Sequence, residues 1–148
     1  MLKSICASAL LLFALVARAQ PLEDCTNMAN RWSDVFTNAP AVETMTGLFL
    51  PNALVFGSLS KELRTTTDDV VAYFSPIYQR KVRPKNSIQS QRAIQIADGV
   101  WVIAGLYDFT NFAADGTQTV NHARFHFVVV REGSQCKIAA SNSSRVPD

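Results

Sequence analysis

The stretch SQRAIQIADGVWVIAGLYDF, residues 90–109, indicates how the second half of this chain folds. Its first part alternates polar with apolar side chains, a period of two that is typical of a strand with one apolar face. Asp98-Gly99 then marks a tight hairpin turn. The residues after the turn, Val100–Phe109, are apolar on both faces and predict a long central strand. The stretch therefore predicts two antiparallel strands joined by a short turn.

On its C-terminal side the stretch is followed by two more predicted strands. A turn at Ala113–Gly116 leads into the strand Thr119–Arg131, and Glu132-Gly133-Ser134 leads into the last strand, Gln135–Asn142. Together with the first hairpin, these segments predict a four-stranded antiparallel meander.

On its N-terminal side the chain has the patterns of helices. Apolar residues recur at steps of three or four within Gln20–Asn38, and Ala41–Leu50 predicts a short second helix that ends near a proline. After a short strand at Ala53–Phe56, Thr66-Thr67-Asp68-Asp69 predicts the start of a third helix, with a threonine cap and acids in the first turn. Helices first and an antiparallel sheet last predict an α+β fold, with the helices packed on one face of a curved sheet.

The N-terminal segment MLKSICASALLLFALVARA has the parts of a secretory signal. Lys3 supplies a positive charge, Ile5–Val16 an apolar core and Ala17-Arg18-Ala19 a small-residue cleavage site. A membrane anchor is the alternative, but this apolar run is shorter than the roughly 20 residues that span a bilayer. The chain of 148 residues therefore predicts a signal peptide at 1–19 and one domain at 20–148, exported to the periplasm or secreted.

The charge of the mature chain bears on its partners. Lys3 and Arg18 are removed with the signal peptide, so the formal net charge of +2 becomes zero. Without a net basic field, neither nucleic acid nor a membrane surface is an expected partner after signal cleavage. The local basic cluster QRKVRPK at Gln79–Lys85 is typical of a solvated helix end.

The mature chain keeps two cysteines, Cys25 and Cys136. An even number in an exported chain suggests one disulfide, because exported compartments are oxidising. Cys136 shares a strand face with Ile138 and Ala140, which marks that face as inward, and Cys25 lies on the apolar stripe of the first helix. Two free buried thiols are the alternative to a bond.

Four segments of this chain follow each other at the spacing of a known family. They are RTTTDDVVAYF at Arg64–Phe74, the stretch at 90–109, ARFHFVVVREGSQCKI at Ala123–Ile138 and NSSRVP at Asn142–Pro147. Together they resemble the bacterial SnoaL-like proteins related to the association domain of calcium/calmodulin-dependent protein kinase II, in the nuclear transport factor 2-like superfamily. The resemblance covers Trp32–Pro147. It implies a cone-shaped α+β fold, a pocket between the curved sheet and a long helix, and dimers or larger rings that assemble through the sheet.

The chain departs from the family pattern at two places. Cys136 stands where the family usually has a tryptophan, and Ala140-Ser141-Asn142 stands where it usually has a run of histidines. Any role of those histidines is not carried over. Because the first helix packs near the sheet in this fold, the resemblance implies that a Cys25–Cys136 disulfide would fill part of the missing tryptophan's volume. Its role would be that of a structural staple.

Two arginines of the resembling segments are candidate ligand-binding residues. Arg92 shares a strand face with isoleucines and is expected to point toward apolar surroundings, where a guanidinium needs an anionic partner. That partner is either a carboxylate of the chain, such as Asp34, Asp68 or Asp69, or the carboxylate of a small ligand. Arg124 alternates with buried phenylalanines, so a subunit interface is the alternative to a place in the pocket.

Two aromatic residues of the central strand complete the candidate site. Trp101 and Tyr107 share one face of this strand with Gly105. The glycine either opens a cavity in that face or marks a bend of the strand. Tyr107 would then be a polar tip in an apolar pocket, whereas core packing is the alternative for Trp101.

The sequence offers few residues for catalysis, and we expect no cofactor and no metal. His122 and His126 lie about 13 Å apart if they are on one strand, too far to share a metal unaided. Asp108 points away from Tyr107, and no other acid–base pair is evident. The leading hypothesis is an exported, non-catalytic small-molecule-binding or oligomeric assembly domain, and the ligand-binding candidates are Arg92, Trp101, Tyr107 and Arg124. The alternative is an isomerase, cyclase or hydrolase that acts on a hydrophobic substrate.

Overall fold

The computed structural model describes residues 22–58 and 60–147, so the signal peptide expected at 1–19 lies outside the described residues. The helical elements are η1 (Cys25–Asn27), α1 (Met28–Asn38), α2 (Val42–Thr46) and α3 (Thr67–Tyr78). The strands are β1 (Phe49–Phe56), β2 (Lys85–Ala97), β3 (Val100–Phe112), β4 (Gln118–Glu132) and β5 (Gln135–Arg145). None of the helices in these ranges is long and apolar enough to cross a membrane.

The strands form one sheet in the order β1-β5-β4-β3-β2. Strands β2 to β5 are the predicted antiparallel meander, with turns at Asp98-Gly99 and Gly133. Strand β1 adds a fifth member and pairs in parallel with β5. It begins at Phe49, earlier than expected, and the predicted helix Ala41–Leu50 is correspondingly reduced to α2.

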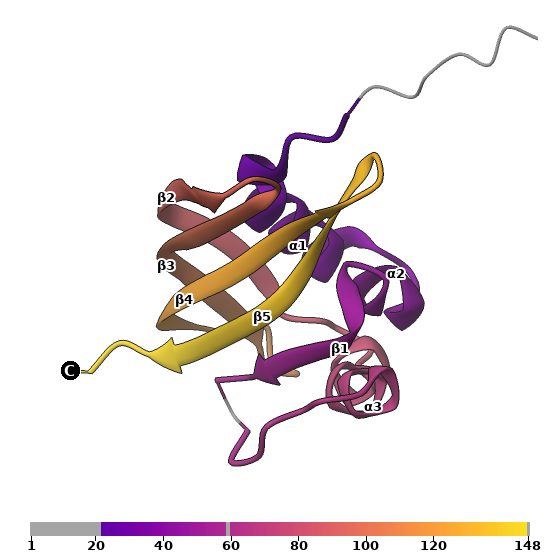
Figure 1. Cartoon of the computed structure of the whole chain (residues 1–148). Coiled ribbons are helices and arrows are strands. Elements are labelled where there is room, and N and C mark those ends of the chain that lie inside the picture. Colours follow the sequence, from indigo (N-terminus) through magenta and orange to yellow (C-terminus); the bar gives the residue numbers. More distant parts are fainter. Residues whose placement is uncertain (1–21, 59, 148) are drawn as a thin grey trace, which may run out of the picture.

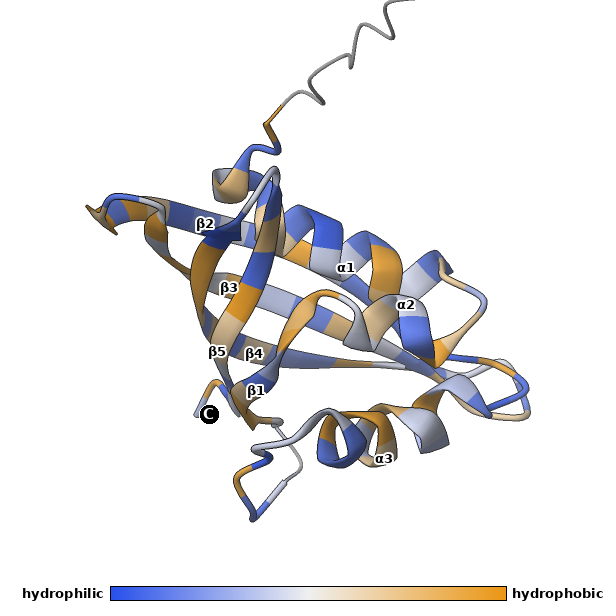
Figure 2. Cartoon of the chain, turned by 45° about the vertical axis from the view of Figure 1, so that its right-hand side comes forward, coloured by the Kyte–Doolittle hydropathy of each residue, from blue (hydrophilic) through white to orange (hydrophobic). Residues whose placement is uncertain are grey.

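The sheet is strongly curved, and the helices lie on its concave side. Figures 1 and 2 show α1 along the inner face of the sheet, with α2 beside it and α3 next to β1. The ring of Trp32 from α1 lies at the centre of this arrangement. Its centroid is within 6.5 Å of the five rings of Phe36, Phe74, Tyr107, Phe109 and Phe127. The predicted α+β class is therefore confirmed, with one aromatic core between two layers.

Helix α3 begins where its capping residues predict. The Thr66 hydroxyl accepts a hydrogen bond from the backbone N–H of Asp69, and the Asp69 carboxylate accepts one from the Thr66 backbone N–H. These two bonds form a capping box, which satisfies donors that the first helical turn leaves without partners. Hydrogen bonds from Thr66 and Thr65 lower the pKa of the Asp69 carboxyl.

Strand β2 contains a bulge that decides which of its side chains face the core. Ile88 pairs with the buried Tyr107, whereas Ser90 pairs with Leu106, so Gln89 is an extra residue. Beyond Gln89 the alternation of inward and outward side chains is shifted by one position.

Gly105 of β3 lies against the backbone of this bulge. A β-carbon at this position would be 2.0 Å from the carbonyl oxygen of Ser90 and 2.9 Å from the Cα of Gln91. The glycine is therefore needed because another strand occupies the space of a side chain, and it does not open a cavity.

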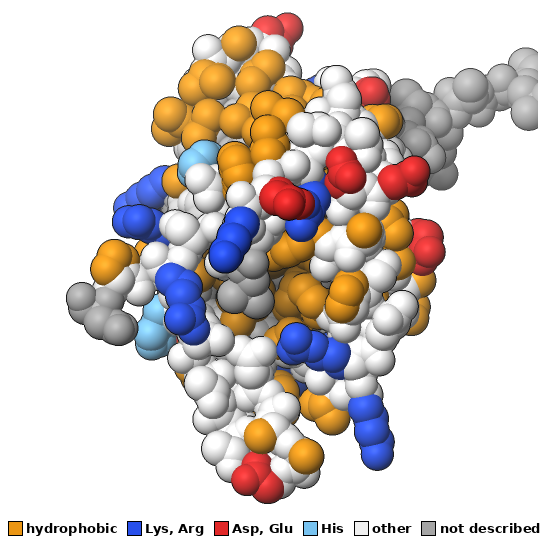
Figure 3. Space-filling model, turned by 90° about the horizontal axis from the view of Figure 1, so that it is seen from below, with side chains coloured by type: hydrophobic (Ala, Val, Ile, Leu, Met, Phe, Trp, Pro, Cys, Tyr) orange, Lys and Arg blue, Asp and Glu red, His pale blue; other side chains and the backbone are white. Residues whose placement is uncertain are grey.

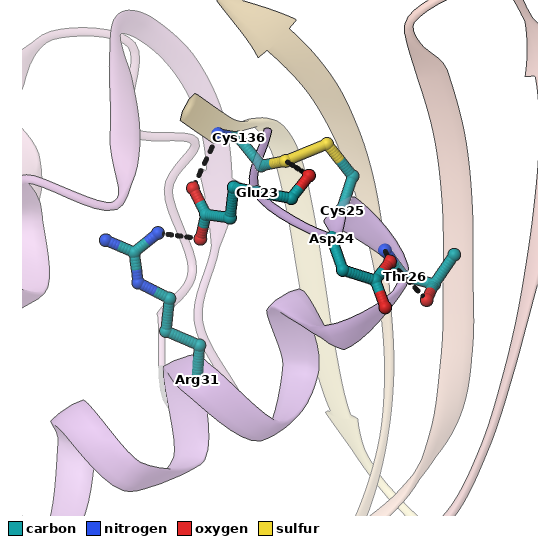
Figure 4. Close-up of a disulfide and its surroundings, with 6 residues drawn as sticks. All are labelled: Glu23, Asp24, Cys25, Thr26, Arg31 and Cys136. Atoms are coloured by element: carbon teal, nitrogen blue, oxygen red, sulfur yellow. Dashed lines mark hydrogen bonds and ion pairs between the residues drawn. A yellow bond between two sulfur atoms is a disulfide. The ribbon is translucent and has the colours of Figure 1, made fainter. Parts of the chain in front are cut away.

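A disulfide joins Cys25 of η1 to Cys136 of β5, and both residues are 1% exposed. Figure 4 shows that Glu23 reinforces the connection. Its carboxylate accepts a hydrogen bond of 2.8 Å from the Cys136 backbone N–H and forms an ion pair with Arg31. Its backbone N–H donates to the carbonyl oxygen of Ser134. The N-terminal end of the described chain is thus attached to the last strand by both covalent and polar contacts.

Candidate functional site

A cavity of about 120 Å³ lies between the inner face of the sheet and helices α1 and α3. Its wall is largely aromatic, because α1, α3 and the central strands each contribute inward-facing rings to it. The aromatic side chains of this wall include Trp32, Phe36, Tyr73, Phe74, Tyr107 and Phe109. Such a concave, mostly apolar space with few polar groups is typical of a small-molecule site.

Two polar groups meet inside the cavity. The hydroxyl of Tyr107 donates a hydrogen bond of 2.5 Å to the Oγ of Ser143. Tyr107 is 2% exposed, and burial strongly raises the pKa of its phenol. The tyrosine therefore stays a neutral hydrogen-bond donor across the physiological pH range.

The mouth of the cavity is basic. Arg80 follows the end of α3, and Arg145 ends β5, so the two side chains approach the opening from different elements. Arg145 donates a hydrogen bond of 3.2 Å to the amide oxygen of Asn121. No Asp or Glu is among the described residues that line the cavity. On the face shown in Figure 3, Lys, Arg and His side chains border recessed hydrophobic ones.

A histidine paired with an aspartate also borders the mouth. The Nδ1 of His122 lies 2.7 Å from a carboxylate oxygen of Asp108. The aspartate side chain is 18% exposed and the histidine 69% exposed, so the imidazole lies on the solvent side of the pair. Residues 121, 122 and 123 all border the cavity, because the opening lies near the end of the strand, where both of its faces are accessible. Strand alternation alone did not indicate that His122 belongs to the site.

Arg92 does not line the cavity. The bulge at Gln89 turns it to the outer face, where it pairs with Ala104 and is exposed. The expectation that Arg92 points toward apolar surroundings is wrong, because unbroken alternation from Ile88 was assumed. Ile94, which shares the face of Arg92, is 61% exposed.

The other three candidates lie at different places. Tyr107 lines the cavity, as described above. Trp101 lies beyond the cavity, with the Arg131 guanidinium 5.3 Å from its ring centroid. Arg124 is exposed on the outer face and donates a hydrogen bond of 2.9 Å to the Oγ of Ser144. The structure therefore brings Tyr107 together with Arg80, Arg145 and His122, none of which was predicted from the sequence to bind a ligand.

A curved sheet that wraps around helices in a cone shape, with a cavity between the two layers, is the nuclear transport factor 2-like architecture. Residues 24–148 match the model of the SnoaL-like domain, and the chain belongs to this family. No curated protein matches the chain.

Solved structures with this fold include proteins of different kinds. A protein from Xanthomonas campestris that is assigned to the calcium/calmodulin dependent protein kinase II association domains has a TM-score of 0.74 and 20% identity, covering 90% of this chain and 99% of that chain. The association domain of CaMKII from C. elegans has a TM-score of 0.65 and 13% identity, covering 80% and 90%. A ketosteroid isomerase-like protein from Erwinia carotovora atroseptica has a TM-score of 0.68 and 11% identity, covering 84% and 95%. At these identities the likeness establishes the fold, which is compatible with both assembly domains and enzymes.

Proposed function

We propose that this protein is an exported, non-catalytic, homo-oligomeric domain that binds a small aromatic carboxylate in its cavity. The observation that carries the proposal is an aromatic cavity with a basic mouth. The disulfide supports export, because such bonds form and persist in oxidising compartments. The likeness to association domains supports self-assembly.

The charges at the mouth favour an anionic group on the ligand. Neither Arg80 nor Arg145 forms an ion pair within the part of the chain that the structure describes. Among the described residues the side chain of Arg145 hydrogen-bonds to the neutral amide of Asn121 and forms no ion pair, so no carboxylate neutralises its charge. A carboxylate matches the planar fork of an arginine and forms strong, charge-assisted hydrogen bonds with it. The aromatic wall then receives the apolar part of the same molecule.

Hydrocinnamate, an aromatic ring on a short carboxylate chain, is the probe for this site. We expect the double variant Arg80→Gln/Arg145→Gln to bind it at least about tenfold more weakly, because both charged donors are lost. The affinity for hydrocinnamyl alcohol, which has no charge, should stay within about twofold. Isothermal titration calorimetry measures both ligands on both proteins.

The matched control is Arg124→Gln, which removes an exposed arginine from the outer face. It should bind hydrocinnamate as the unchanged protein does. If the Arg80→Gln/Arg145→Gln variant and the control bind hydrocinnamate with equal affinity, the proposal of a carboxylate site at the mouth of the cavity is wrong.

A second candidate function is an isomerase, cyclase or hydrolase that acts on a hydrophobic substrate. The observation that favours it is the His122–Asp108 pair, in which a carboxylate holds an imidazole at the mouth of an apolar cavity. An imidazole oriented in this way is suited to general acid–base chemistry. If NMR spectra of the probes incubated with the protein show a product that accumulates with time, the protein is an enzyme and the proposal of a non-catalytic binding domain is wrong.

The outer face of the sheet is the surface that we propose for self-assembly. Leu54, Ile94 and Leu106 lie on it and are 48%, 61% and 46% exposed. Association through this face would bury these exposed apolar side chains, which favours it energetically. Arg124 pairs across the strands with Leu106, so the centre of this face also carries a positive charge.

We expect Leu106→Arg to convert the oligomer to a monomer at micromolar concentration. The new arginine would face Arg124 and its copies, and it would replace apolar contact with like charges. Native mass spectrometry measures the subunit number, and the intact mass also shows whether the chain begins after Ala19. The control is Leu63→Arg, an exposed leucine outside the strands, which should leave the subunit number unchanged. An unchanged oligomer in Leu106→Arg would place the interface elsewhere.

A further inference from the structure

Two serine side chains of β5 face into the cavity. Ser141 and Ser143 are alternate residues of the strand and therefore share its inner face, opposite the buried Phe127 and Phe125. Ser141 is 9% exposed, and its hydroxyl has no hydrogen-bond partner within the described part of the chain. Its oxygen is not among the fully buried atoms that have no partner, so it is accessible from the cavity, where a ligand can reach it. The position thus has a polar group that the fold itself does not use.

Tyr107 and Ser143 add a second group of the same kind. The two hydroxyls have two protons, and their hydrogen bond uses one of them. The other proton has no acceptor among residues 22–58 and 60–147. Donation from the phenol also polarises the serine hydroxyl and makes it a better donor. An acceptor on a ligand would therefore meet two adjacent donors on this wall, one from Ser141 and one from the pair.

The inner end of the cavity disfavours a charged acceptor. Ser143 is the alternate residue next to Arg145 on the inner face of β5, but Ser141 lies four residues from Arg145 and pairs across the strands with the buried Phe127. An anion placed there would lose its hydration without gaining a counter-ion. The raised pKa of Tyr107 points the same way, since burial already opposes negative charge at this place. The acceptor that suits this end is a neutral oxygen.

We propose that Ser141, Ser143 and Tyr107 form a subsite for a neutral oxygen, hydroxyl or carbonyl, at the end of the ligand opposite its carboxylate. The inference rests on the proposed function and specifies its ligand as an aromatic acid with an oxygen substituent on the ring. A cavity of about 150 Å³ admits benzene and this one, of about 120 Å³, is somewhat smaller, so it has room for at most one ring, and the carboxylate chain would extend to the mouth.

The test compares hydrocinnamate with its para-hydroxy and para-methyl derivatives. The two substituents are similar in size, so a difference between them reports hydrogen bonding and not fit. On the unchanged protein we expect the hydroxy compound to bind at least about tenfold more tightly than the methyl compound, by isothermal titration calorimetry. This comparison needs no variant and does not depend on the folding of one.

The double variant Ser141→Ala/Ser143→Ala locates the preference. It should reduce the ratio of the two dissociation constants to within about twofold, while the methyl compound still binds. The matched control is Ser144→Ala, on the same strand but hydrogen-bonded to Arg124 on the outer face, and it should keep the full ratio. Thermal unfolding of all three proteins verifies that each is folded.

The outcomes separate this inference from the function on which it rests. A tenfold preference that is lost only in Ser141→Ala/Ser143→Ala supports the subsite. Equal binding of the two derivatives, or a preference that persists in that variant, overturns the subsite and leaves the carboxylate site in place. If none of the three acids binds the unchanged protein, the proposed function and the subsite both fail.

Discussion

Gly105→Ala is expected to lower the free energy of unfolding by at least about 3 kcal/mol, at the upper end of what overpacking of a core costs. The new β-carbon would lie 2.0 Å from the Ser90 carbonyl oxygen, 2.9 Å from the Cα of Gln91 and 3.0 Å from the ring of Phe125. Two of these three atoms belong to backbone, which cannot rotate away as a side chain can. Strand β2 would have to move, and the bulge at Gln89 with it. Denaturation with urea, followed by circular dichroism, measures the loss.

Gly116→Ala is the matched control for this substitution. Gly116 has a φ of 86°, and a β-carbon added to it would have no atom within 4 Å, so alanine there costs only backbone strain. We expect about 1 kcal/mol for it. If Gly105→Ala were no more destabilising than Gly116→Ala, the conclusion that β2 lies too close to Gly105 for a side chain would be wrong.

Removal of the disulfide has the second large expected effect. The bond closes a loop with a sequence separation of 111 residues, and loss of a native disulfide from a small secreted domain typically costs about 2–5 kcal/mol. We expect Cys25→Ala/Cys136→Ala to lose stability in this range, because the unfolded chain regains the freedom that the cross-link removes. The N-terminal segment would then keep the hydrogen bonds of Glu23 as its polar attachment to the end of the sheet at β5. Urea denaturation of both proteins measures the difference.

Reduction provides the control for the disulfide. Dithiothreitol present during denaturation should lower the stability of the unchanged protein to near that of Cys25→Ala/Cys136→Ala, and it should not affect the variant. A variant as stable as the oxidised protein would show that the bond is not a staple.

Features that depend on neighbouring residues were predictable from the sequence. Asp98-Gly99 forms the expected turn, and Thr66 caps α3. The bond between Cys25 and Cys136 also agrees with the pairing that the resemblance implied. In each case the determining chemistry is local or is limited to very few partners. A positive φ requires glycine, a helix start requires a side-chain acceptor, and two cysteines allow one pairing.

The position of the candidate ligand-binding groups was not predictable in the same way. Arg92 was placed on the inner face from alternation, but Gln89 is an extra residue in β2 and reverses the face of every residue that follows in that run. A bulge is a property of two paired strands, so it depends on the close approach of β2 to Gly105 as well as on the sequence of β2. An alternating pattern in the sequence describes one strand by itself, so it does not reveal a bulge that shifts the alternation.

Local sequence was sufficient for the fold class, the caps, the turns and the apolar identity of the core, because each follows from the conformational or solvation preference of a short segment. Only the tertiary structure assembled the mouth of the cavity. Arg80 comes from the end of α3, His122 from β4 and Arg145 from the end of β5. These residues become neighbours only when curvature brings the ends of distant elements together, and curvature arises from the twist of the strands and from the bulges in the sheet.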